Sequence, residues 1–213
     1  MCFLFLLYLA FASLVHTQID SESRVHTKAS PGSRCVRHIS IMINKFSLTH
    51  TSQCARLQYE FGSSAHDRIA FRNTTAFNSQ QSGRAGYWTQ QEASVIPRCR
   101  FTPTCAEDVA LAVSTLSQCN CLFAIRGGGH MSWAGAANIQ DGVAIDLSLM
   151  NSVEVSEDRH TTSVGPGARW HHVYNKLDSL GLSVVGGRVS DVGVAGVTLG
   201  GIEFLGCDIV HRH

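Results

Sequence analysis

The glycine run Gly127–Gly129 constrains this chain most, because it directly follows a short apolar segment. Leu122–Ile125 is typical of a strand, and Arg126 joins it to the glycines. Three glycines let the backbone turn sharply with its N–H groups converging, and such a concavity binds phosphate oxygens. The Gly-Lys-Ser/Thr of a Walker loop and the GxGxxG order of a Rossmann fingerprint are both missing. The pattern indicates either an anion-binding loop or a tight turn, and the spacing alone favours neither.

A second glycine-rich tract spans Gly186–Gly201 and is densest from Gly193 onward. Small residues at this density allow a planar ring or another backbone segment to approach closely. The alternative is that these glycines belong to a strand and its turn. A single extended ligand that needs both glycine tracts would explain why the chain carries two.

The rest of the pattern alternates between helices and strands. Thr104 and Glu107 form a predicted capping box that begins a helix ending near Gln118. A second helix is expected over 169–180, with Gly181 just past its end. The inward positions are Val109, Val113 and Leu116 in the first helix, and Trp170, Val173, Tyr174, Leu177 and Leu180 in the second. Strands are expected over 122–125, 143–147, 153–155, 161–164 and 182–185. This indicates an α+β fold, a mixed sheet with helices packed on it.

Three histidines lie near these elements. His130 follows the glycine run, where a hydrogen-bonding role is the simplest interpretation. A neutral imidazole also has a free lone pair, so His130 could act as a nucleophile toward an electrophilic cofactor carbon. His171 and His172 are adjacent in a predicted helix and point about 100° apart, so they do not chelate one ion well. We expect no metal site.

Composition and the N-terminus limit the function classes. The chain has 44% hydrophobic and 15% charged residues and a net charge of +1, which gives no electrostatic support for binding nucleic acid or a membrane surface. Residues 1–18 are predicted to be a secretory signal peptide, because the apolar stretch Phe3–Val15 is too short to span a bilayer. The alternative is a buried N-terminal helix.

Cysteines and a sequon agree with secretion. Seven cysteines remain after residue 18, so some should pair in an oxidising compartment while the odd count leaves one over. They lack the spacing of a zinc site. Asn73 begins the sequence Asn-Thr-Thr, an acceptor for N-glycosylation in a secreted protein.

Several ordered motifs together resemble one family. They include FAIRGGGH at 123–130, WAGAAN at 133–138, VAIDLS at 143–148, VGPGARW at 164–170, VGGR at 185–188 and DVGVAG at 191–196, followed by LGG at 199–201. Upstream, YWTQQ at 87–91 and Pro97-x-Cys99 look like the family's lead-in. Over roughly residues 54–201 the chain resembles the fungal branch of the berberine-bridge-enzyme-like oxidases, which belong to the vanillyl-alcohol-oxidase-type FAD superfamily.

The resemblance implies a PCMH-type FAD-binding domain with roles for the matched residues. His130 would carry a covalent bond to the flavin, while Val189 replaces the cysteine that many relatives use for a second bond. Cys54 would form a disulfide with Cys119 or Cys121. The implied cofactor-binding residues are Arg126, Gly127, Gly128, Gly129, His130, Met131, Ser132, Gly193, Val194, Gly196, Leu199 and Gly200.

The resemblance also implies an organisation and an activity. We expect a signal peptide at 1–18, an arm and lead-in at 19–94, and a PCMH-type domain at 95–213 that is incomplete at its C-terminus. The implied enzyme transfers a hydride from a small secondary-metabolite type substrate to covalently bound FAD and then passes the electrons to O2. Two alternatives are an inactive, truncated remnant of such an oxidase and a secreted, disulfide-bonded domain that acts by binding a partner.

Overall fold

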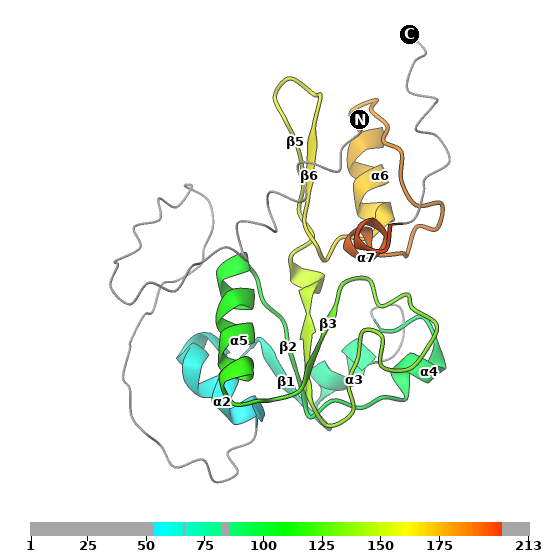
Figure 1. Cartoon of the computed structure of the whole chain (residues 1–213). Helices are drawn as coiled ribbons and strands as arrows, with labels where there is room; N and C mark the ends of the chain where they lie inside the picture. Colours follow the sequence, from blue (N-terminus) through cyan, green and yellow to red (C-terminus); the bar gives the residue numbers. More distant parts are fainter. Residues whose placement is uncertain (1–52, 66, 82–85, 202–213) are drawn as a thin grey trace.

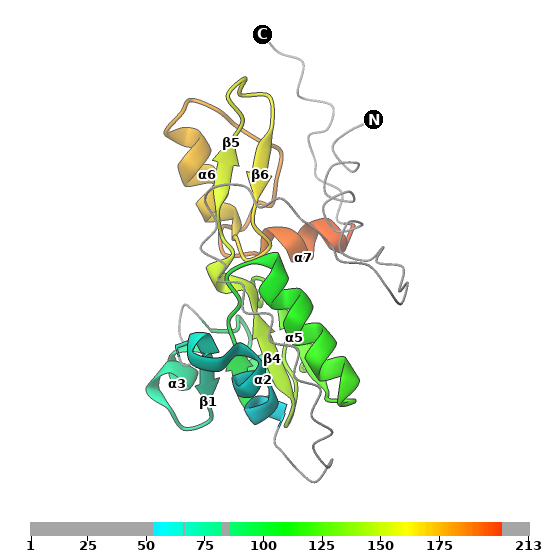
Figure 2. The same ribbon diagram turned by 90° about the vertical axis from the view of Figure 1, so that its left-hand side faces the viewer.

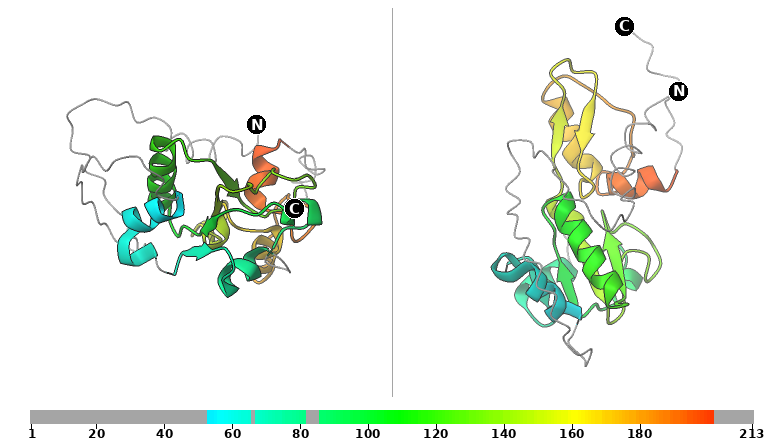
Figure 3. Two further views of the ribbon diagram at one scale, coloured as in Figure 1. Left: turned by 90° about the horizontal axis from the view of Figure 1, so that it is seen from below. Right: turned by 60° about the vertical axis from the view of Figure 1, so that its left-hand side comes forward.

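The computed structural model describes residues 53–65, 67–81 and 86–201, which build two stacked layers (Figure 1). The lower layer has a four-stranded sheet, with helices α2 (Gln53–Phe61) and α5 (Ala106–Gln118) on one side. Helices α3 (Thr75–Gln81) and α4 (Gln90–Ala93) lie on the other side, as the view from below shows (Figure 3). This mixed arrangement confirms the predicted α+β class. The predicted signal peptide and residues 19–52 lie outside the described residues.

The sheet has the strand order β1-β2-β4-β3. β1 (Ile69–Phe71) is antiparallel to β2 (Cys99–Phe101), while β4 (Val143–Asp146) is parallel both to β2 and to β3 (Phe123–Arg126). All four residues of β4 are buried, as expected for a central strand covered on both faces. The fully buried side chains of the main core include Leu57, Cys99, Phe101, Ala112, Leu116, Val143 and Ile145.

Helix α5 begins differently from the sequence expectation. Its N-cap is Cys105 rather than Thr104, and Glu107 does not close the first turn. Instead, the Asp108 carboxylate accepts hydrogen bonds from the backbone N–H of Thr104, at 3.0 Å, and from its hydroxyl, at 2.9 Å. The predicted capping box was therefore wrong, because Asp108 rather than Glu107 binds the backbone N–H of Thr104. The Asp108 carboxylate also pairs with Arg68, far along the chain. The predicted apolar face and the end at Gln118 are confirmed.

The disulfide prediction for Cys54 was wrong. Cys54 in α2 bonds to Cys99 in β2, with their Cα atoms 6.0 Å apart. Cys119 and Cys121 bond to each other across Asn120, which has a positive φ of 50°. Helix α2 packs beside β1 and α5. Cys54 therefore faces the core, where it reaches Cys99 at the start of β2.

The upper layer contains a hairpin and two helices (Figure 2). The predicted hairpin is confirmed, with β5 (Val153–Val155) antiparallel to β6 (Thr162–Val164). The predicted helix is also confirmed: α6 spans Trp170–Asp178, and Gly181 beyond it has a φ of +67°. A second core gathers here, made of Ala168, Trp170, Val173, Leu177 and Val194.

The predicted strand over 182–185 is absent, and this segment is irregular. Tyr174 donates its hydroxyl to the Gly187 carbonyl at 2.7 Å, which holds the segment over α6. A Cβ on Gly186 would collide with the Trp170 ring, lying 2.6 Å from its Cε3 atom, so only glycine allows this approach. Because residues 182–185 pack on α6 rather than beside a strand, their backbone forms no β-sheet hydrogen bonds with any strand that the structure describes.

Candidate functional site

The first glycine run forms a loop at the carboxyl end of β3, where the chain leaves the sheet. Gly129 has a φ of +66°, a conformation that other residues rarely adopt. Gly128 and Gly129 are buried, whereas the following Met131 and Ser132 are exposed. The loop therefore turns from the protein interior to the surface within a few residues.

The second glycine tract meets this loop directly. It forms a short helix, α7 (Val194–Leu199), with Gly193 as its N-cap, so the alternative of a strand and turn was wrong. A Cβ on Gly128 would lie 2.5 Å from the Cα of Gly193, and a Cβ on Gly193 would lie 2.7 Å from the Cα of Gly128. Side chains at either position would collide with backbone. The contact brings the two tracts together, and the idea that a single extended ligand needs both of them stays a prediction.

Backbone hydrogen bonds hold α7 in this position. Val194 donates its N–H to the Ala168 carbonyl at 2.9 Å, and Trp170 donates to Val192 at 3.1 Å. Arg169 and Gly193 also form an isolated antiparallel bridge. The start of α6 therefore positions the start of α7, and α7 in turn supports the glycine loop.

Other glycines in these tracts leave space open. Gly196 on α7 is exposed, and among the described residues a Cβ built on it would meet nothing within 4 Å. A Cβ on Gly127 would meet only the Pro166 carbonyl, at an ordinary 3.4 Å. Backbone packing explains Gly128 and Gly193, but it does not explain these two. A concave surface with small residues and open faces suits the close approach of an extended ligand such as a dinucleotide.

The segment before α4 fixes the outer part of the loop. Trp88 donates its backbone N–H to the Gly129 carbonyl at 3.0 Å. The Thr89 hydroxyl reaches the Ser132 carbonyl at 3.2 Å. His130 lies between these two attachments, and its imidazole stacks on the Trp88 indole with ring centroids 4.6 Å apart. The lead-in segment therefore belongs to the site.

Two buried residues that sequence reasoning missed hold the chain after the loop. The Glu92 carboxylate is fully buried and accepts hydrogen bonds from the backbone N–H groups of Ala136 and Ala137. Asn138 donates its amide to the Glu92 carbonyl at 3.1 Å and to the Val95 carbonyl at 2.7 Å. The available signal was Thr89-Gln-Gln-Glu92, which has capping-box spacing. Thr89 does cap α4, but the Glu92 side chain binds the distant loop instead.

The Arg126 side chain is buried and passes beneath the loop, where a Cβ on Gly129 would lie 3.0 Å from its Nε. It forms an ion pair with Asp146 at 3.3 Å and donates to the Gln80 carbonyl at 2.9 Å. Its guanidinium lies over the Tyr87 ring, 4.6 Å from the centroid. Burial raises the pKa of the Tyr87 phenol, which the nearby arginines partly oppose. Arg126 thus anchors the loop through the core.

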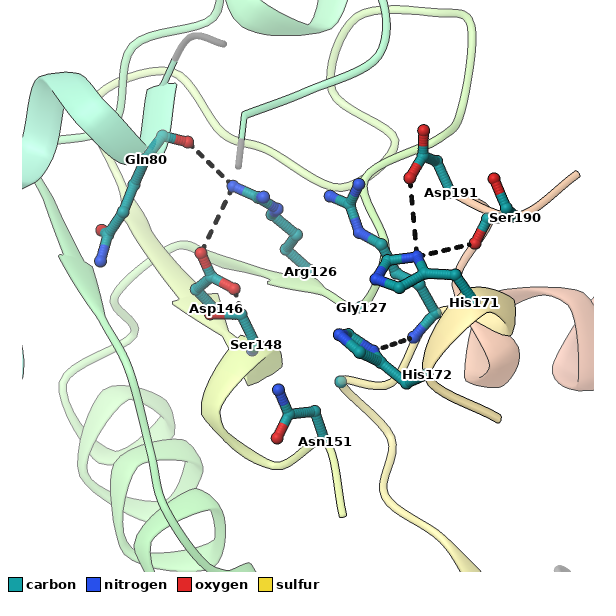
Figure 4. A pocket seen from close by; sticks show the side chains of 12 residues that line it. Gln80, Arg126, Gly127, Asp146, Ser148, Asn151, His171, His172, Ser190 and Asp191 are labelled. Carbon is teal, nitrogen blue, oxygen red and sulfur yellow. Dashed lines mark hydrogen bonds and ion pairs between the residues drawn. The ribbon is translucent and has the colours of Figure 1, made fainter. Parts of the chain in front are cut away.

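A polar cavity of about 550 Å³ lies behind the glycine loop, between the two layers (Figure 4). Arg126 and Asp146 lie on one side of it, and His171 and His172 lie on the other (Figure 4). The remaining lining residues are Gln80, Gly127, Ser148, Asn151, Gly167, Arg169, Ser190 and Asp191. The cavity adjoins the loop at Gly127, and its volume is typical of small-molecule and cofactor sites.

The two histidines of α6 each have one engaged nitrogen. His172 accepts the backbone N–H of Arg169 on Nδ1 at 3.0 Å, and burial together with His171 and Arg169 lowers its pKa. His171 Nδ1 lies 3.1 Å from the Ser190 carbonyl and 3.6 Å from an Asp191 oxygen. In the part of the chain that the structure describes, no group of three potential metal ligands occurs.

The remaining predicted residues fall into separate environments. Val194, the first residue of α7, is buried, while Leu199 is 68% exposed and Val189 is 52% exposed. Gly200 follows α7 as its C-cap. Asn73 lies in an exposed turn between β1 and α3, with a φ of 71°. No described helix is long and apolar enough to cross a membrane.

An α+β domain in which a glycine loop meets a second glycine tract is typical of cofactor-binding domains. Residues 97–209, more than half of the chain, match the sequence profile of the family described as "FAD binding domain". The chain belongs to this family.

Relatives and solved structures agree with this assignment. The chain is 42% identical to the "FAD-dependent monooxygenase sdcF" of Emericella nidulans over 150 residues, which cover 70% of this chain and 30% of that protein. It is 42% identical over 115 residues to the "FAD-dependent monooxygenase tpcD" of Cochliobolus heterostrophus, covering 54% of this chain and 22% of that protein. The chain is thus homologous to fungal FAD-dependent monooxygenases and spans less than a third of their length.

Two solved structures share the fold. The berberine-bridge-enzyme-like protein 1 of Physcomitrella patens matches with a TM-score of 0.56 and 25% identity, over 69% of this chain and 30% of that chain. A chitooligosaccharide oxidase matches with a TM-score of 0.57 and 20% identity, over 68% of this chain and 29% of that chain. The recognised family and the PCMH-type fold are therefore confirmed.

Proposed function

We propose that this chain forms part of the FAD-binding surface of an oxidoreductase. The enzyme would oxidise a small organic molecule of the secondary-metabolite type. The observation that carries the proposal is the Gly128–Gly193 contact, which brings the two glycine tracts together. Gly127 lines the adjoining cavity, and among the described residues nothing lies within 4 Å of a Cβ on Gly196. FAD would supply the hydride acceptor, and O2 would be the final electron acceptor. Homology to fungal FAD-dependent monooxygenases supports the redox class.

The residues of the loop and α7 would hold the cofactor without bulky side chains. The backbone of Gly127–Ser132 would present its N–H groups to the pyrophosphate, in keeping with the general preference of such nests for anions. Gly193, Val194, Gly196, Leu199 and Gly200 would line the flavin from the α7 side. Arg126 would contribute by anchoring the loop through Asp146, since its side chain is buried.

His130 would tether the flavin. It lies on the loop next to exposed Met131, and its imidazole is only partly buried. Val189 stands where many relatives have a cysteine, so we propose a single covalent bond. In this proposal the attachment would be acid-stable, and a His130→Ala variant would release its flavin on acid precipitation.

A secreted location also fits the described residues. The Cys54–Cys99 and Cys119–Cys121 disulfides are typical of oxidising compartments, and Asn73 is exposed in a turn where a glycan would meet no core residue. We therefore include export and glycosylation in the proposal.

The direct test is flavin stoichiometry. The purified 213-residue chain is mixed with FAD, desalted and examined for flavin absorbance, and then precipitated with acid. Bound flavin that stays in the pellet of the wild type but not of His130→Ala supports the proposal. A folded chain that retains no flavin at all would contradict FAD binding by this chain and favour the remnant or the partner-binding alternative.

A further inference from the structure

The Trp88 indole stacks on the His130 imidazole. The two rings are 4.6 Å apart between centroids and only 15° from parallel. This is the near-parallel stacked geometry that aromatic pairs prefer, and such pairs add a favourable interaction beyond the area that they bury. Trp88 is 62% exposed, so burial alone does not explain why its indole lies here.

The backbone places the two rings together. Trp88 donates its N–H to the Gly129 carbonyl, one residue before His130. Thr89 extends its hydroxyl toward the Met131 carbonyl, one residue after His130, at 3.4 Å. The backbone of His130 is thus held on both sides by two consecutive residues of another segment, and the stack fixes the remaining rotation of the ring.

A stack on the ring face has a chemical consequence. The lone pair of a neutral imidazole lies in the plane of the ring, so a partner on the face leaves both nitrogen edges free. Within 53–65, 67–81 and 86–201, no group hydrogen-bonds to a ring nitrogen of His130. His171 and His172 differ, because each has its Nδ1 engaged by a backbone group or carboxylate.

We propose that Trp88 is a positioning residue: it holds the His130 imidazole by its face, so that a ring nitrogen stays free and points in one direction for bonding to a flavin. This inference rests on the proposed function, in which His130 is the tether. Its structural part, the fixed orientation of the ring, can be tested without any flavin.

The first experiment measures the ring directly. Histidine ring resonances of the isotope-labelled, flavin-free chain are recorded by NMR, and His130 is assigned by its loss in His130→Gln. We expect a ring-current shift in the wild type that Trp88→Phe largely keeps and Trp88→Ala removes. Trp133→Ala is the matched control, because it removes another indole of similar exposure, 61%, that does not stack on His130. A His130 signal unaffected by Trp88→Ala overturns the proposal.

The second experiment measures attachment. Each variant is incubated with FAD, and total and acid-stable flavin are followed over time. Trp88→Ala should keep reversible FAD binding. Acid-stable flavin should form on the order of 10- to 100-fold more slowly, because a misoriented reacting group lowers a reaction rate by factors of this size. Trp88→Phe should restore most of the rate. Equal rates in the wild type and Trp88→Ala overturn the proposal. If no variant binds FAD, the proposed function fails for this chain, and the NMR result alone decides whether Trp88 positions His130.

Discussion

Gly128 and Gly193 touch backbone to backbone, and neither has room for a side chain. A Cβ on Gly128 would come within 2.5 Å of the Gly193 Cα. This contact joins the lower layer, which carries the loop after β3, to the upper layer, which carries α7. The geometry of the candidate cofactor surface therefore depends on this backbone contact as well as on any contact that the two glycines make with the cofactor.

Gly128→Ala should separate the two glycine tracts. The added methyl group must displace backbone, and overpacking of this kind costs roughly 1–3 kcal/mol or more. We expect a lower urea midpoint of unfolding together with weaker FAD binding. A variant that unfolds like the wild type and binds FAD equally well would show that the contact is not required.

Gly196→Ala should have the opposite balance of effects. The added Cβ meets nothing within 4 Å in the described part of the chain, and alanine in a helix is more stable than glycine by up to about 1 kcal/mol. Stability should stay the same or rise, while FAD binding weakens because the methyl group fills the open face. Titration of flavin fluorescence against protein checks this. Unchanged affinity would place the ligand away from this turn of α7.

Asp146→Asn should be strongly destabilising. The change leaves the Arg126 guanidinium buried without its carboxylate, and breaking a buried ion pair costs roughly 3–5 kcal/mol. Chemical denaturation measures the loss. The matched control is Asp141→Asn, which breaks the exposed Arg72–Asp141 pair at 2.8 Å and should change stability little. Similar effects of both changes would contradict a special role for the buried pair.

Removal of the Cys54–Cys99 disulfide should destabilise the lower layer. The bond closes a separation of 45 residues, for which chain entropy predicts a contribution of about 4 kcal/mol. A double alanine variant at these positions should therefore unfold at clearly lower denaturant concentration. Cys119 and Cys121 are only two residues apart, so their double alanine variant should lose much less. Equal losses would contradict the entropy argument.

The pKa of His172 predicts a pH dependence of stability. Because the folded-state pKa is lowered, the folded protein binds this proton less well than the unfolded chain does. Stability from this group is therefore complete above about pH 6.5 and is lost as the pH falls through the lowered folded-state value. His172→Asn keeps a hydrogen-bond acceptor but does not titrate, so the acid-side slope of stability should flatten. A slope as steep in His172→Asn as in the wild type would contradict this assignment.

Local patterns in the sequence were sufficient for much of the fold. The helical spacing of Val109, Val113 and Leu116 predicted α5, and the apolar run at 143–147 predicted the central strand. The hairpin and α6 were predicted from turn residues and from Gly181. These features depend on neighbours along the chain, which a sequence displays directly.

The errors have a common physical origin in contacts between distant segments. Cys54 pairs with Cys99 because α2 packs across the sheet, which no spacing of cysteines reveals. The segment at 182–185 has strand-like residues but lies on α6 through Tyr174 and Gly187. At the site, Glu92 was overlooked because its role is to hold the backbone at Ala136 and Ala137, far along the chain.

The place of β4 between β2 and β3 has a consequence for biosynthesis. β2 and β3 are translated first, yet each finds its parallel neighbour only in Val143–Asp146. At a usual elongation rate of about 5–20 residues per second, β2 waits roughly 2–8 s on the ribosome for that strand. During this interval the nascent chain carries an incomplete sheet, so cellular chaperones would meet it before the sheet closes.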